Sequence, residues 1–186
     1  PEVLLEPVER PVVVVGLPRS GTTHLVNLLA TDPRLQSLPL WESYEPLPLP
    51  GEPAPGDQSD PRYRRCAEAW TGMQQATPLI AAMHPMEPDH VHEELELMGP
   101  DFASYNFEWL AHSPGWRDYY YAHDQTPHYE YLKNVLRLLQ WRRRRRDRWV
   151  LKCPQHLEQL PVLLRVFPDA TVVFTHRDPV AVIQST

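Results

Sequence analysis

The chain contains few cysteines and no long run of apolar residues, and each shortage excludes a class of protein. Its 186 residues include only two cysteines, Cys66 and Cys153, so we expect neither a disulfide framework nor a metal knuckle. A reducing, cytoplasmic compartment is then the default expectation. No apolar stretch approaches the roughly 20 residues that a membrane-spanning helix needs, so we expect no membrane span.

The sequence also lacks the features of a signal peptide at its N-terminus and an excess of positive charge. Residues 1–10 show neither the basic start nor the apolar middle of a signal peptide, and the absence of an initiator Met is consistent with a natural start upstream. The formal net charge of −6 disfavours a general nucleic-acid binder. We interpret the arginine run 142–146 as the solvated end of a helix rather than a docking patch for an acidic partner.

Prolines, by contrast, are abundant, and they cluster between Pro39 and Pro61. Proline removes a backbone donor and clashes with the preceding helical turn, so this segment is predicted to hold neither a helix nor an inner strand. Apolar segments on both sides suit a single core. We therefore interpret the segment as an extended loop within one domain.

Three short apolar runs indicate buried strands, and they are residues 12–15, 148–152 and 171–175. Helices are expected over 22–31 and 157–167, and a further one begins at Pro179. Strands that alternate with helices in this way predict an α/β fold with a parallel sheet and crossover helices. Between these parts, residues 62–147 are expected to be mostly helical, with breaks at Pro78, Pro85, Pro88, Pro100, Pro114 and Pro127.

The strongest local pattern is VVVVGLPRSGTTHL, residues 12–25, in which a buried strand leads through a glycine-containing loop into a helix. Backbone amides of such a loop converge on an anion, and the helix N-terminus favours negative charge. The spacing from Gly16 to Gly21 fits a P-loop, but Thr22 stands where a nucleoside triphosphatase has Lys. The positive charge lies at Arg19 instead, which suits a donor that needs no obligatory metal.

The loop sequence PRSGTT resembles the 5′-phosphosulfate loop of sulfotransferases that use 3′-phosphoadenosine 5′-phosphosulfate (PAPS). The basic residue of that loop is Lys or Arg, and Arg19 stands at its position. The resemblance implies that PAPS is the donor and that no metal is required. The residues implied to bind the donor here are Pro18, Arg19, Ser20, Gly21, Thr22 and Thr23.

A second resemblance concerns the 3′-phosphate of the same nucleotide. In these enzymes an Arg at a strand end and a Ser eight residues later bind that phosphate, and Arg177 and Ser185 match this spacing. An Arg fork can hold a phosphate through two hydrogen bonds. The stretch 148–179 also resembles the corresponding segment of bacterial-type sulfotransferases.

The resemblance implies a P-loop-like, three-layer fold with a largely helical middle insertion. We assign residues 1–186 to a single domain, made of a phosphosulfate loop unit (10–38), a Pro-rich loop (39–61), a helical acceptor region (62–147) and a 3′-phosphate-binding unit (148–186). In the family a Gly-containing basic segment beyond the 3′-phosphate helix completes the nucleotide site. We therefore expect the domain to be incomplete at its C-terminus.

Sulfuryl transfer requires an in-line nucleophile and neutralisation of charge on the leaving oxygen. Arg19 is predicted to supply that charge, and Lys152 either contacts the transferred group or lies in solvent as a strand-end lysine. The resemblance offers two general bases. Glu42 stands where carbohydrate-type sulfotransferases place a catalytic Glu, and His156 lies near the His that cytosolic sulfotransferases use, at a different spacing. Glu42 is preferred, and a loop carboxylate in solvent or in an ion pair remains its alternative.

A polar cluster, DHVHEELE at residues 89–96, also contains possible ligands. Its histidines and carboxylates lack a third ligand placed by the sequence, so we expect a solvated helix start rather than a metal site. His92 remains a weak alternative base.

Taken together, these patterns predict a sulfotransferase that moves a sulfuryl group from PAPS to a hydroxyl or amine acceptor. The acceptor is expected to be a small molecule, a carbohydrate or a lipid, and the oligomeric state is not indicated. Two alternatives stay open. One is a P-loop kinase or triphosphatase with Asp178 as metal ligand, and the other is an inactive or truncated nucleotide-binding module.

Overall fold

The computed structural model describes residues 2–83, 86–145 and 147–185. Within it the chain forms two compact units, one made of Pro1–Ser37 with Glu93–Thr186 and the other of Leu38–His92. The assignment of one domain with four consecutive parts stays a prediction.

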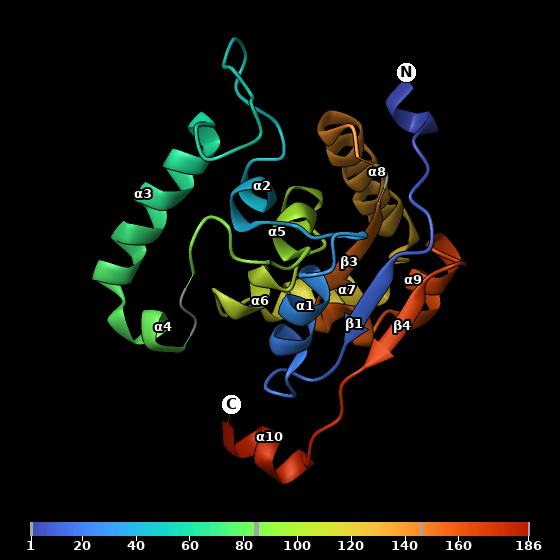
Figure 1. The fold of residues 1–186 in the computed structure, drawn as a ribbon. Coiled ribbons are helices and arrows are strands. Elements are labelled where there is room, and N and C mark those ends of the chain that lie inside the picture. The colour runs from blue at the N-terminus through green and yellow to red at the C-terminus, as the bar shows by residue number, and fades with distance from the viewer. Residues whose placement is uncertain (1, 84–85, 146, 186) are drawn as a thin grey trace. The chain divides into compact units, whose positions relative to one another are not determined.

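The first unit is built on a four-stranded sheet with the order β2-β3-β1-β4 (Figure 1). Strand β1 (Val12–Val15) lies at its centre and pairs in parallel with β3 (Arg148–Lys152) and β4 (Thr171–Phe174). Strand β2 (Leu35–Gln36) pairs in parallel with the start of β3. The predicted α/β fold with a parallel sheet is confirmed. β2 was not expected, because two residues are too short to show a hydrophobic pattern.

Burial differs along the sheet. All four residues of β1 are buried, and so is β3 after its first residue. The expectation that 171–175 forms a buried strand is wrong in its burial, because Thr171 and Phe174 are exposed. Among the described strands β4 pairs with β1 alone, and such an edge strand has fewer elements to pack against.

Helices cover the sheet and connect its strands (Figure 1). The principal ones are α1 (Thr22–Ala30), α8 (Thr126–Arg143) and α9 (Leu160–Val166). A further helix, α10 (Pro179–Ser185), follows β4. The helix predicted over 157–167 is shorter in the structure, since α9 begins only at Leu160 and a separate 3₁₀ helix, η3 (Pro154–Leu157), precedes it. The remaining elements of this unit are η1 (Glu2–Leu5), α5 (Leu95–Met98), η2 (Gly99–Asp101), α6 (Asn106–Trp109) and α7 (Pro114–Ala122).

Several prolines begin helices instead of only interrupting them. Pro114 and Pro179 are the first residues of α7 and α10, and Pro127 is the second residue of α8. The first turn of a helix has no acceptor for its amides, so proline costs little there. Pro85, also expected to mark a break, lies outside the described residues.

The arginine run begins inside α8, which ends at Arg143. The Arg143 guanidinium lies 4.9 Å from the Trp149 ring centroid and donates to Ser37 O at 3.0 Å. The interpretation of the run as a solvated helix end is therefore wrong for this residue, because an aromatic face and a carbonyl satisfy its charge. Arg146 lies outside the described residues.

The second unit contains α2 (Leu40–Tyr44), α3 (Pro61–Ala76) and α4 (Pro78–Met83). The prediction that 39–61 holds no helix is wrong for α2. Pro39 precedes this helix and the next proline is Pro46, so a proline-free window accommodates a single turn. Burial of Leu40 and Trp41 against Cys66 stabilises that turn.

The start of α3 contains a fully buried ion pair. Asp60 caps the helix by accepting from the Arg62 amide, and the Arg62 guanidinium binds the same carboxylate at 2.8 Å. These hydrogen bonds, more than burial, set the pKa of Asp60, which is lowered from its usual value. None of the described helices in either unit is long and apolar enough to cross a membrane.

Candidate functional site

The loop between β1 and α1 is closed against the end of β4. The Ser20 hydroxyl lies 2.7 Å from the Thr175 hydroxyl, and the Ser20 amide donates to Leu17 O at 3.2 Å. A side chain at Gly16 would collide with Thr175, so close approach of the two segments requires glycine here. The loop is therefore held by the strand that precedes the second predicted phosphate element.

Two residues of this loop have a left-handed backbone, Arg19 with φ 66° and Gly21 with φ 93°. Glycine adopts that conformation freely, whereas it is strained for Arg. Gly21 immediately precedes α1, and among the described side chains none caps this helix start. The first-turn amides of α1 can therefore bind an anion. Thr22 is buried in this turn, while Pro18 and Arg19 are exposed.

The two predicted phosphate elements meet in the structure. Arg19 Nε donates to the Ser185 hydroxyl at 3.2 Å, across 166 residues of sequence. Arg177 Nη1 donates to the carbonyl oxygen of Arg19 at 2.9 Å, across 158 residues. Two exposed guanidinium groups and a hydroxyl are thereby gathered at the carboxyl edge of the sheet, where α/β folds commonly bind ligands.

Lys152, the last residue of β3, points at the same loop. Its Nζ donates to the Thr23 hydroxyl at 3.3 Å and forms an ion pair with Glu93. The lysine side chain is only 3% exposed. This placement excludes the alternative of a strand-end lysine in solvent. It brings a cation to the first turn of α1.

Two adjacent carboxylates, Glu93 and Glu94, complete this arrangement. The expectation that residues 89–96 form a solvated helix start is wrong for them, since Glu94 is fully buried and the Glu93 side chain is 15% exposed. Lys152 compensates both, Glu93 through Nζ and Glu94 through its backbone amide at 3.1 Å. Glu93 Oε2 is buried and has no hydrogen-bond partner among the described residues.

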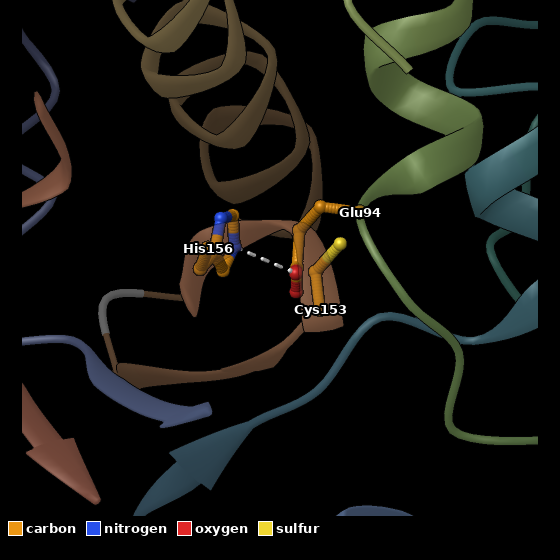
Figure 2. A group of neighbouring side chains, drawn as sticks. All are labelled: Glu94, Cys153 and His156. Atoms are coloured by element: carbon orange, nitrogen blue, oxygen red, sulfur yellow. Dashed lines mark hydrogen bonds and ion pairs between the residues drawn. The ribbon is translucent and has the colours of Figure 1, made fainter. Parts of the chain in front are cut away.

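A buried hydrogen-bond chain leads from Glu94 into the core, and Figure 2 shows its first contact, between Glu94 and His156. His156 Nε2 lies 3.2 Å from Glu94 Oε2, and His156 Nδ1 lies 2.8 Å from the Tyr129 hydroxyl. Burial raises the pKa of Tyr129 well above its usual value. His156 itself is fully buried and both ring nitrogens have partners. This placement favours a positioning role for His156 over the predicted role of general base.

The same cluster contains potential metal ligands. Glu94, Cys153 and His156 each offer a ligand atom, and these atoms lie within 4.8 Å of one another. Burial and the nearby carboxylates Glu93 and Glu94 raise the pKa of the Cys153 thiol well above its usual value. The ring nitrogen nearest the carboxylate is already in hydrogen-bond contact with it. The cluster fits a hydrogen-bond network better than a metal site.

Glu42, the other predicted base, belongs to the second unit, where it lies in α2 and is 6% exposed. It is therefore not the solvated loop carboxylate of the alternative interpretation. Its role as a base stays a prediction.

A cavity of about 730 Å³ lies elsewhere in the first unit, and its lining residues are Glu6, Gln140, Trp141, Arg142, Arg144 and Arg145. Gln140 accepts a hydrogen bond from the indole of Trp149, near the start of β3. Lys152 is at the other end of that strand. The cavity is therefore distinct from the candidate site.

Comparisons with known proteins agree with this geometry. Residues 11–186 match the model of the Sulfotransferase family. The structure is similar to sulfotransferase STF1 from Mycobacterium tuberculosis H37Rv (TM-score 0.81, 36% identity), covering 95% of this chain and 48% of that protein. It is also similar to sulfotransferase STF9 from Mycobacterium avium (TM-score 0.82, 31% identity), covering 100% of this chain and 47% of that protein. Among curated proteins, no sequence matches significantly.

Proposed function

Since this chain belongs to the sulfotransferase family, we propose that it transfers a sulfuryl group from PAPS to a hydroxyl or amine acceptor. The observation that carries the proposal is the meeting of the two phosphate elements through Arg19, Arg177 and Ser185. The chain spans about half the length of the two solved sulfotransferases. The proposed activity is therefore that of the whole protein.

Donor binding uses both elements. The first-turn amides of α1, with the hydroxyls of Thr22 and Thr23, bind the 5′-phosphate as an anion at a helix N-terminus. Arg177 and Ser185 bind the 3′-phosphate through charge-assisted hydrogen bonds. The hydrogen bond between Arg19 and Ser185 supports binding of one donor molecule by both elements.

The transfer step breaks one bond to sulfur and forms another. The acceptor oxygen or nitrogen attacks sulfur while the bond from sulfur to the bridging oxygen breaks, and its electron pair remains on the 5′-phosphate. Arg19 belongs to the phosphate loop (residues 16–21), and Lys152 contacts Thr23 just after it. These two cations neutralise the charge that grows on that oxygen. The proton of the acceptor must pass to a base.

Glu93 is the base that the geometry favours. Its carboxylate is held at the phosphate loop by Lys152, and its Oε2 has no partner among the described residues. An oxygen in that position can accept the proton of an incoming hydroxyl. Glu42 remains the alternative base proposed from the resemblance. The acceptor class, a small molecule, a carbohydrate or a lipid, and the cytoplasmic location also stay predictions.

The other candidate functions now have less support. Thr22 replaces the P-loop lysine of kinases and triphosphatases, and the family match is to transferases of another chemistry. Donor binding that does not require magnesium would separate the two readings further. An inactive nucleotide-binding module would bind the donor without turnover, so an activity assay distinguishes it.

The test is calorimetric titration with 3′-phosphoadenosine 5′-phosphate, the desulfated product of the donor. Arg19→Ala and Arg177→Ala should each weaken binding more than tenfold, since each removes a charge-assisted contact of about 1.5–3 kcal/mol. Arg142→Ala, in the distant cavity, is the matched control and should bind as the wild type does. Unchanged affinity in both site variants would refute the proposal.

A further inference from the structure

The adjacent residues Glu93 and Glu94 bind the two ends of one lysine. Glu93 forms the ion pair with Lys152 Nζ, whereas Glu94 Oε1 accepts the Lys152 backbone amide at 3.1 Å. The lysine Nζ in turn contacts the Thr23 hydroxyl at 3.3 Å. The position of the cation at the phosphate loop therefore depends on the backbone contact as well as on the ion pair.

Glu94 is itself fixed from behind. Its second oxygen contacts His156 Nε2 at 3.2 Å, and His156 Nδ1 contacts the Tyr129 hydroxyl at 2.8 Å. In the arrangement that we infer, Tyr129 donates to Nδ1 and Nε2–H donates to the carboxylate. Each of the two contacts then has one donor and one acceptor. All three residues are fully buried.

We propose that Glu94 is a positioning residue for sulfuryl transfer, and that His156 and Tyr129 hold it in place. It touches neither donor nor acceptor, and acts by fixing the end of β3 together with the Glu93–Lys152 pair. This inference rests on the proposed function. It separates the roles of two neighbouring glutamates, one facing the site and the other facing the core.

A zinc ion is the main competing explanation for the same atoms, because Glu94, Cys153 and His156 are grouped closely enough to share one. The hydrogen-bond network is favoured because both ring nitrogens of His156 already have partners, Glu94 at Nε2 and Tyr129 at Nδ1. Metal analysis of the purified protein decides between them. One equivalent of zinc that survives dialysis would make Glu94 a ligand and overturn the proposal.

The first experiment compares Glu94→Gln with the control Glu130→Gln. Glu130 is an exposed carboxylate on α8. The amide keeps the shape of Glu94 but presents a donor to His156. We expect kcat to fall at least tenfold in E94Q, while KM and the affinity for 3′-phosphoadenosine 5′-phosphate change less than threefold. A general loss of structure would weaken that affinity as well. E130Q should behave as the wild type, and an E94Q kcat within threefold of wild type would overturn the proposal.

A spectroscopic readout separates this inference from the proposed function. ¹⁵N NMR of the His156 ring should show the proton on Nε2 in the wild type and on Nδ1 in E94Q. Exchange of the Lys152 amide should be faster in E94Q. Both signals can be measured even if the protein transfers no sulfuryl group. The positioning role of Glu94 can therefore be tested even if the proposed function is refuted. An Nδ1–H ring in the wild type would overturn the inference.

A milder variant covers the case in which E94Q does not fold. Tyr129→Phe removes only the hydrogen bond at the far end of the chain. It should lower kcat about threefold with KM unchanged, and free the His156 ring to exchange tautomers. Wild-type kcat together with a single unchanged tautomer in Y129F would contradict the proposal.

Discussion

Each unit of the molecule contains a buried carboxylate paired with a cation. The two pairs differ in how far apart the partners are in the sequence. In the second unit Asp60 pairs with Arg62, two residues away, and both side chains are almost fully buried. In the first unit Glu93 pairs with Lys152, 59 residues away, at the phosphate loop. The first pair is local and the second joins two distant segments.

The comparison teaches how to tell a structural ion pair from a functional one. Arg62 donates both to Asp60 and to the carbonyl oxygens of Glu45 and Pro46, and its guanidinium lies 4.6 Å from the Trp41 ring centroid. Among the described residues, each side-chain nitrogen of Arg62 and each carboxylate oxygen of Asp60 has a hydrogen-bond partner. The Glu93–Lys152 pair retains a buried carboxylate oxygen without a described partner. This difference is the reason that Glu93, and not Asp60, is proposed as the base.

The largest expected effect comes from breaking the local pair. Arg62→Ala leaves the Asp60 carboxylate buried and uncompensated, so the free energy of unfolding should fall by about 3–5 kcal/mol. Urea denaturation measures this loss. The affinity for 3′-phosphoadenosine 5′-phosphate should stay within twofold of wild type in conditions where the variant is folded. A loss below about 1 kcal/mol would show that the pair is not structural.

Breaking the distant pair should affect catalysis instead. Glu93→Gln removes the proposed base, and kcat should fall at least 100-fold, within the range of about 10²–10⁴ that general acid–base catalysis contributes. Steady-state kinetics measures this, and the unfolding free energy should change little. Glu42→Gln is the matched comparison. If it abolishes turnover while Glu93→Gln does not, the base is Glu42.

A smaller effect follows from the titration of the local pair. The pKa of Asp60 is lowered in the folded state, chiefly by its hydrogen bonds to Arg62. A lowered folded pKa stabilises the protein above the unfolded value of 3.8, and this contribution is lost as the pH falls through the folded pKa. Unfolding free energy below about pH 4 should therefore fall more steeply in wild type than in Asp60→Asn. Parallel pH profiles would contradict this.

The smallest effect concerns the two thiols, one in each unit. Burial raises the pKa of Cys66 to about 11 and that of Cys153 well above its usual value, so neither should react quickly with a thiol reagent at pH 8. Arg62→Ala should expose Cys66 about tenfold more often while Cys153 remains protected, as expected for local opening. Mass spectrometry of pulse-labelled protein measures both rates. Equal acceleration at the two sites would mean that the units open together.

The phosphate loop and its neighbouring strands could be predicted from the sequence because their signals are local. A run of valines, two glycines at fixed spacing and a hydroxyl-rich helix start lie within residues 12–25. Arg177 and Ser185 could be found in the same way, by resemblance over nine consecutive positions. The structure adds that these two segments contact each other.

Other features could not be predicted, because they depend on partners distant in sequence. The sequence predicts Glu93 and Glu94 as solvated charges. Only the fold brings Lys152, 59 residues after Glu93, into contact with both. His156 was placed near the chemistry by its neighbours in sequence, but its ring is turned toward Tyr129 in the core. Burial of a titratable group follows from tertiary packing, and no short motif encodes it.

Gly16 couples the side-chain sizes that are allowed in two segments, the β1–α1 loop and the end of β4. Any side chain at this position would meet the hydroxyls of both Thr175 and Ser20, so the loop and the strand end constrain each other's size. A library that varies the loop alone will lose most members at this position. Replacement of the glycine would require smaller side chains at both Ser20 and Thr175 first.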